Sequence, residues 1–326
     1  MGKKITVTVL LCLAAAILSL CLGAARLSPG QLWLALTKGP GDTAGYIFWY
    51  VRLPRTLGCL LAGAALAVSG GVVQTVLDNK LASPSIIGVN AGAGLAVTLC
   101  CALGVLSGWA IAGAAFLGAM ISVLLIIFAA EKAGASRTTV ILGGVAVNAF
   151  LNALSEALTT LIPEAGMLAG DFRVGGFSAV TYPRLLPGAV VILLGMGLLF
   201  SLHNQLDVLS LGAGTARSLG MEVKTMRTLF LVLAAALAGS AVSFGGLLGF
   251  IGLIIPHAVR KLFGSESRCF LPVCAIAGGF FVTLCDTAAR VAFAPYELPV
   301  GILLSVLGGP FFLLLLMNRK GGRKNA

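Results

Sequence analysis

The sequence predicts an all-α integral membrane protein with ten transmembrane helices. Of its 326 residues, 59% are hydrophobic and only 10% are charged, and the mean hydropathy is +1.05. Soluble domains have about 25% charged residues. The apolar residues are gathered into long runs, and a helix that crosses a bilayer needs about 20 such residues. The basic residues lie mostly in every second connection between these runs.

Ten apolar segments are expected to form the helices, and the third and eighth are shorter than a full span. An even number of crossings places both ends of the chain on the same side of the membrane. The expected segments are 5–25, 54–77, 91–107, 109–130, 138–162, 185–202, 227–244, 248–262, 270–293 and 299–317.

The distribution of charge gives the orientation. Fifteen of the 22 Lys and Arg residues fall on the side of the N-terminus and seven on the other side. Because basic residues are enriched in cytoplasmic loops, both termini and residues 203–226 are predicted to be cytoplasmic. This topology explains the net charge of +11. No basic cluster alternates with aromatic residues, so nucleic acid is not an expected partner.

The first segment follows a basic start with Lys3 and Lys4. A signal peptide has an apolar core of about 7–15 residues, and the run in 5–25 is longer, so a retained helix is expected. The longest outside loops are 26–53 and 163–184, and the second is expected to hold a short surface helix.

The fifth segment carries polar residues at helical spacing. Intervals of four, four and three residues place them on one face of a helix. A carboxyl group within a membrane usually faces the bundle interior or a wet cavity. This face is therefore expected either to line a translocation path or to make hydrogen bonds between helices. Its residues are Asn148, Asn152, Glu156 and Thr159.

The polar residues of the eighth and ninth segments are expected to have structural roles. Asp286 and Arg290 lie four residues apart in the ninth segment and are expected to form an ion pair. His257 follows Pro256 in the eighth segment, and haem ligation by this single histidine is the less expected alternative to a structural role. The eight cysteines lie mostly in apolar runs without a C-x-x-C pair, so neither a metal site nor a disulfide is expected.

The sequence contains no catalytic signature. It lacks the G-x-x-x-x-G-K-[ST] loop that binds ATP, the H-E-x-x-H motif of zinc-dependent hydrolases and the G-x-S-x-G motif that carries a nucleophilic serine. The chain is therefore not expected to be an enzyme. If it moves a solute by ATP hydrolysis, a separate subunit must supply the ATPase.

Five stretches carry a family resemblance, in this order along the chain. They are VRLPRTLG…VNAGAG (51–94), LSLGAGTARSLGM (209–221), GFIGLIIPHAVRKLFG (249–264), LCDTAARV (284–291) and ELPVGILLSVLGGPFFLLLL (297–316). Together they resemble the FecCD-type permeases of ABC importers for ferric siderophores, haem and cobalamin.

The resemblance implies the type II ABC importer permease fold, with residues 1–326 as a single transmembrane permease domain. It implies a second permease subunit, expected to be an identical copy, two cytoplasmic ABC ATPases and an extracytoplasmic binding protein. ATP and Mg would be bound by the ATPases, so no cofactor is expected in this chain. The expected place is the inner membrane of a bacterium, surrounded by lipid. The expected cargo is an iron chelate, either a ferric siderophore or haem, with cobalamin as the alternative.

The resemblance also assigns the cytoplasmic segment 209–221. In the family this segment forms short coupling helices that dock in a groove of the ATPase. An amphipathic helix suits a groove, and Gly212, Gly214 and Gly220 would break it into pieces. The expected contact residues are Leu209, Leu211, Ala216, Arg217, Leu219 and Gly220.

Two further sets are carried over by position. Outward-facing arginines of the family dock acidic residues of the binding protein, and Asn79 and Ser136 match candidate gate positions. The family's turn R-N-P-L-A reads DNKLA at 78–82, and loss of the proline is expected to loosen it. The arginines that match the docking positions are Arg52, Arg55 and Arg290.

A secondary transporter driven by an ion gradient is the rival prediction. Glu156 and Asp286 would then be its coupling carboxylates, and the isolated chain would transport without an ATPase.

Overall fold

The computed structural model describes residues 2–23, 29–132, 137–292 and 296–318, and within these ranges it contains helices but no strand. The elements, in order, are α1 (Gly2–Cys21), α2 (Pro29–Lys38), α3 (Thr43–Tyr46), the π-helix η1 (Ile47–Arg52), α4 (Leu53–Val76), α5 (Val89–Ala102), α6 (Gly108–Lys132), α7 (Arg137–Leu161), α8 (Pro163–Leu168), α9 (Gly170–Val174), α10 (Tyr182–Ser201), α11 (His203–Ser210), α12 (Ala213–Ser218), α13 (Val223–Gly245), α14 (Ile251–Phe263), α15 (Ser267–Ala292) and α16 (Val300–Asn318).

Each of the ten predicted segments overlaps a helix of the described chain. Seven helices of the described chain are long and apolar enough to cross a membrane. The helices α5 and α16 are apolar but shorter, and α14 has only 13 residues. Ten membrane crossings therefore remain a prediction, while a multi-pass membrane protein is well supported.

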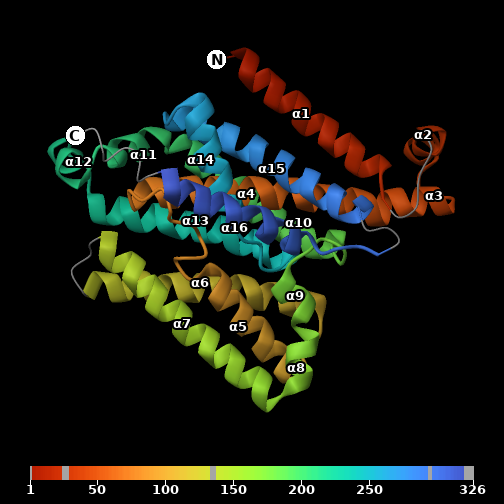
Figure 1. Cartoon of the computed structure of the whole chain (residues 1–326), viewed down its shortest axis with the longest axis horizontal. Coiled ribbons are helices and arrows are strands. Elements are labelled where there is room, and N and C mark those ends of the chain that lie inside the picture. Colours follow the sequence, from red (N-terminus) through yellow and green to blue (C-terminus); the bar gives the residue numbers. More distant parts are fainter. Residues whose placement is uncertain (1, 24–28, 133–136, 293–295, 319–326) are drawn as a thin grey trace.

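The helices form two groups around α4, which Figure 1 shows at the centre of the molecule. The most apolar window of α4 is 83% buried, and α4 packs mainly against α15, α13 and α14. The helices α5, α6, α7 and α8 form the second group, joined to the first chiefly where α13 packs on α6. The helix α1 lies at the edge against α15.

Glycines allow the central helices to approach each other closely. A Cβ atom added to Gly63 of α4 would overlap the backbone oxygen of Gly278 in α15, and one added to Gly278 would overlap that of Gly63. Gly70 of α4 meets the backbone of Gly252 in α14 in the same way. Such contacts pack membrane helices by close backbone approach, which fixes α4, α14 and α15 as one unit.

The predicted outside loops hold short helices. The second loop contains α8 and α9, in agreement with the expected surface helix. The first contains α2, α3 and η1, which the sequence did not predict. Asp42 caps α3 by accepting a hydrogen bond of 2.7 Å from the backbone N–H of Gly45.

Polar contacts between α1, α11, α14 and α15 define one end of the bundle. At one end, Lys4 of α1 donates to the backbone oxygen of Leu262 over 3.3 Å, and the Asp207 carboxylate of α11 accepts from the backbone N–H of Ser267 over 3.0 Å. These contacts gather the start of α1, the end of α14, the start of α15 and α11. We call this the α12 end, because α12 lies there as well (Figure 1).

Candidate functional site

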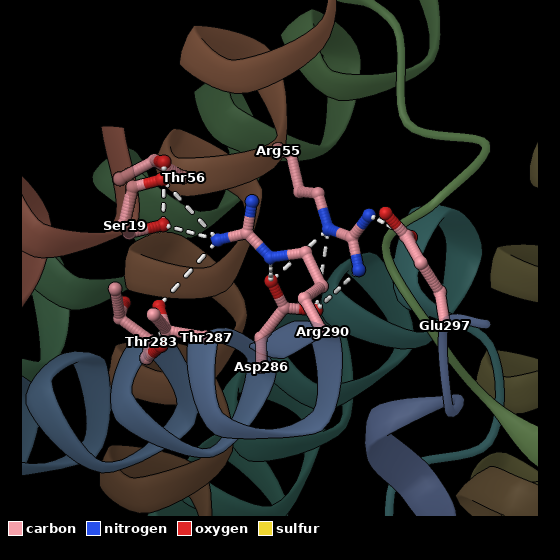
Figure 2. A network of polar contacts seen from close by, with 8 residues as sticks. All are labelled: Ser19, Arg55, Thr56, Thr283, Asp286, Thr287, Arg290 and Glu297. Carbon is pink, nitrogen blue, oxygen red and sulfur yellow. Dashed lines mark hydrogen bonds and ion pairs between the residues drawn. The ribbon is translucent and has the colours of Figure 1, made fainter. Parts of the chain in front are cut away.

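A buried ion network holds the other end of the bundle together, and we call it the outer network. Figure 2 shows its charged residues meeting between α4, α15 and the segment before α16. Arg55 donates from Nε and Nη2 to the two carboxylate oxygens of Asp286, each over 3.0 Å. Its Nη1 donates to Glu297 over 2.6 Å. Asp286 therefore receives a bidentate arginine, the strongest geometry for such a pair.

Arg290 completes the outer network. Its Nε lies 3.1 Å from Oδ2 of Asp286, an ion pair without the alignment of a hydrogen bond. Its Nη2 donates to the hydroxyl of Ser19 over 2.8 Å, and Ser19 lies 2.8 Å from the hydroxyl of Thr56. The predicted pair of Asp286 and Arg290 is confirmed, and the network also ties in α1.

The three predicted docking arginines are buried. Arg52, Arg55 and Arg290 are 3%, 6% and 3% exposed, and Arg52 donates to the backbone oxygens at the end of α1 over 2.6 and 2.7 Å. The expectation of outward-facing side chains is therefore wrong, because carboxylates and carbonyls of this chain take up the guanidinium groups. Docking of a binding protein by these residues remains a prediction. Only Glu297 of the network, 36% exposed at its side chain, reaches the surface.

The polar face of α7 divides into two parts. Asn148 donates to the backbone oxygens of Ser85 and Ile86 over 2.9 and 3.1 Å, and thus holds the segment before α5. Asn152 and Glu156 are exposed. Thr159 donates to the backbone oxygen of Glu156 over 3.0 Å. Asn148 therefore has a packing role, whereas lining of a path by the exposed residues stays a prediction.

Ser155, seven residues after Asn148 on α7, makes a buried polar contact that the sequence did not indicate. The hydroxyl of Ser155, 2% exposed, accepts a hydrogen bond from Arg173 of α9 over 2.8 Å. It also lies 3.2 Å from the hydroxyl of Thr98 in α5. A serine in an apolar helix gives no sequence signal that separates it from its neighbours, so this contact appears only in three dimensions.

The segment 209–221 is broken into short helices at Gly212 and Gly220, but Gly214, which was also predicted to break it, lies within α12. Gly212, at φ +102°, separates α11 from α12, and Gly220, at φ +82°, follows α12. Both torsions lie in the left-handed region that glycine adopts without steric cost. Leu211 and Leu219 are 61% and 63% exposed.

The predicted contact residues of this segment fall into two classes. Leu209 and Ala216 are fully buried against the chain's own helices, so they anchor the segment and are not available to a partner. Leu211, Arg217, Leu219 and Gly220 are exposed. The structure thus corrects the predicted apolar face, and it leaves two large apolar side chains and one cation on the surface.

The turn 78–82 is held by hydrogen bonds despite the missing proline. Asn79 accepts a hydrogen bond at Oδ1 from the backbone N–H of Leu81 over 3.0 Å. Arg137, at the start of α7, pairs with Asp78 over 2.8 Å. The expected loosening of this turn by loss of the proline stays a prediction. Ser136, the other predicted gate residue, lies outside the described residues.

Arg260 of α14 holds α4 in place through contacts that the sequence did not indicate. Its Nη2 donates to the backbone oxygen of Gly71 over 3.1 Å and to the hydroxyl of Thr75 over 2.9 Å. Its Nη1 donates to Gln74. The guanidinium also lies 4.5 Å from the ring centre of Phe270. Arg260 thus fastens α14 to the last turns of α4.

The nearby His257 packs edge-on against Phe311.

Comparison with known proteins identifies the family. The model of the FecCD transport family matches residues 11–318. The vitamin B12 import system permease protein BtuC of Salmonella paratyphi A is 37% identical over 315 residues, which cover 95% of this chain and 93% of BtuC. The iron-uptake system permease protein FeuB of Bacillus subtilis is 35% identical over 313 residues, with the same coverage.

Solved structures agree with this result. An inward-facing structure described as a metal-chelate type ABC transporter superposes with a TM-score of 0.87 at 29% identity, covering 98% of this chain and all of the other. The PsaBC complex of Streptococcus pneumoniae shares the fold at a TM-score of 0.55 and 18% identity, covering 79% of this chain and 89% of the other. The family match spans almost the whole chain and the relatives match it over nearly their full lengths, so the chain belongs to the FecCD transport family.

Proposed function

We propose that this chain is the permease of an ATP-driven importer that carries an iron chelate, either a ferric siderophore or haem, across the inner membrane by alternating access. The family match over residues 11–318 carries the proposal. Two permease copies would enclose the path, two ABC ATPases would bind ATP and Mg at the α12 end, and an extracytoplasmic binding protein would deliver the cargo at the other end. Both termini would then be cytoplasmic.

The exposed part of the segment 209–221 supports ATPase docking at the α12 end. Leu211 and Leu219 expose large apolar side chains on either side of Arg217. Apolar anchors beside a cation suit a groove on a partner protein. The anchors are held in place by Leu209 and Ala216, which are buried below them.

The exposed faces of α7 and α16 support the second permease copy. Large apolar side chains on both helices are 57% to 79% exposed, among them Val145 and Leu161 of α7 and Val306 of α16. The helix α7 lies at the margin of the bundle in Figure 1. An identical copy would cover these faces and leave Asn152 and Glu156 of α7 beside the path.

The cargo is inferred from the relatives. FeuB is named for iron uptake, the structure with a TM-score of 0.87 is described as metal-chelate type, and BtuC is named for vitamin B12. FeuB favours iron, a metal chelate is compatible with it, and cobalamin is the alternative. Competition of radiolabelled ferric siderophore, haem and cobalamin for uptake would separate these cargoes.

The ion-coupled alternative has little support in the geometry. Asp286 is shared by Arg55 and Arg290 and its side chain is 1% exposed. A coupling carboxylate must exchange its ion with water, and this one is already neutralised by two guanidinium groups.

The test is purification of the chain from native membranes in mild detergent, with mass spectrometry of the proteins that accompany it and an absorption spectrum of the eluate. A stoichiometric subunit with a phosphate-binding loop is expected. The variant Arg217→Glu should weaken that association, whereas the matched variant Lys261→Glu on α14 should not. Transport by an oligomer that lacks an ATPase, in vesicles without ATP, would refute the importer.

A further inference from the structure

A cavity of about 430 Å³ lies between α6, α7, α12 and α13, and of its polar lining residues only Arg217 has a role in the function proposed above. We call it the basic pocket. Its polar lining comes from all four helices and contains four cations and one carboxylate. These lining residues are Glu131, Arg137, Arg217, Lys224, Arg227 and Thr228.

The carboxylates near the basic pocket do not balance its cations. Glu131 pairs with Lys224 over 3.1 Å, and Asp78, outside the lining, pairs with Arg137 over 2.8 Å. Arg137, Arg217 and Arg227 all line this one cavity. Like charges gathered in a partly enclosed space raise the energy of the site until an anion enters.

Arg137 has donors directed away from its ion pair. Its Nε and Nη2 atoms are buried, and within the described residues they have no hydrogen-bond partner. Arg137 lines the pocket, so a rotation of its side chain would present both donors to an oxyanion, as the fork of an arginine does to phosphate. The pocket thus offers unused donors as well as an excess of positive charge.

The lining below the cations is apolar. Ile127, Val140 and Leu231 lie there, on helices that are long and apolar enough to span the membrane. On the outside of α6, Leu125 and Phe128 are 50% and 61% exposed. A free inorganic anion would use only the cations, whereas a phospholipid would use both the cations and the apolar surface.

We propose that the basic pocket binds the phosphate headgroup of an anionic phospholipid from the leaflet at the α12 end. Basic pockets between transmembrane helices at the cytoplasmic surface suit such headgroups. The headgroup connects Arg137 of α7, Arg217 of α12 and Arg227 of α13. A bound lipid therefore fixes α12 relative to α7, the helix with the exposed polar face.

The test is native mass spectrometry of the purified full-length chain, with any subunits that accompany it, after addition of phosphatidylglycerol or phosphatidylcholine. Retention of phosphatidylglycerol over phosphatidylcholine is expected. Lys224→Gln should weaken this retention about fivefold, from the contribution of one Lys or Arg near an anionic headgroup. Lys261→Gln, which removes the same charge outside the pocket, should leave it unchanged.

The variant Glu131→Gln is expected to have the opposite effect on lipid binding. It removes the carboxylate that competes for Lys224, so phosphatidylglycerol should bind more tightly, a result that misfolding cannot produce. Equal retention of the two lipids, equal loss in Lys224→Gln and Lys261→Gln, or weaker binding in Glu131→Gln would overturn the proposal. Complete displacement of phosphatidylglycerol by excess inorganic phosphate would assign the pocket to a small anion instead of a lipid.

Discussion

Asp286→Asn removes the shared carboxylate from the centre of the outer network. The side chain is 1% exposed, and it lies within 3.0–3.1 Å of two different guanidinium groups. An asparagine of the same shape keeps the packing but leaves Arg290 buried without its counter-charge, while Arg55 retains Glu297. Breaking a buried ion pair by removing one partner costs about 3–5 kcal/mol. We expect a loss of unfolding free energy in that range.

The assay is reversible unfolding of the purified chain in mixed detergent micelles, with Glu297→Gln as the matched control. Glu297 binds the same arginine, but its side chain is 36% exposed, and exposed ion pairs contribute about 0–1 kcal/mol. The control should therefore lie close to wild type. If Asp286→Asn lost no more stability than Glu297→Gln, the buried charge would not be what stabilises this end of the bundle.

A double variant separates the two charges further. Arg290→Met removes the cation that Asp286→Asn leaves uncompensated, so the double variant should lose less than the sum of the single losses. Non-additivity is the sign of a direct interaction between neighbours. If the losses of unfolding free energy in the two single variants simply added, Asp286 and Arg290 would not interact directly.

Four other substitutions probe the packing and the docking surface. Gly63→Leu should destabilise the chain by about 1–3 kcal/mol or more, since any Cβ there meets the backbone of Gly278; thermal unfolding measures it. Leu209→Asp should abolish folded protein because it buries an unpaired charge, whereas Leu211→Asp should fold and lose ATPase association, as size-exclusion chromatography and co-purification would show. Arg260→Gln should cost about 1.5–3 kcal/mol for its charged hydrogen bonds, measured by the same unfolding assay.

The helices themselves were predictable because each long apolar run needs internal hydrogen bonds within a membrane. The short helices α2 and α3 and the π-helix η1 were missed, since none of them has a long apolar run. The pair Asp286–Arg290 was found from its spacing of four residues. The contact of Arg55 with Asp286 joins positions 231 residues apart, and no local sequence pattern predicts it.

The segment 209–221 shows why the predicted face was only half right. Leu209, Ala216 and Leu219 were all expected to contact the ATPase, from a segment that glycines divide into short helices. Gly212, at φ +102°, separates α11 from α12, so the spacing of apolar residues does not fix which of them share a face. Leu209 and Ala216 consequently point into the bundle, while Leu219 points out. A positive torsion at one glycine cannot be read from the spacing of apolar residues.

The fastening of α4 at both ends leads to a last prediction about motion. Arg55 ties the first turn of α4 to α15, Arg260 ties its last turns to α14, and glycine contacts join all three helices between these points. We expect α4, α14 and α15 to move as one body during the proposed transport cycle.

By contrast, α7 is joined to the turn after α4 by one ion pair, Arg137–Asp78, whose Asp78 side chain is 70% exposed. Such a pair contributes little to stability, so rearrangement at this point costs less than within the central body. A cross-link between α4 and α15 should therefore leave ATP-dependent uptake in vesicles intact, and one between α7 and the turn 78–82 should block it. Inhibition by the first cross-link alone would show that the central body itself must deform, and the fastening at both ends of α4 would then not define a rigid unit.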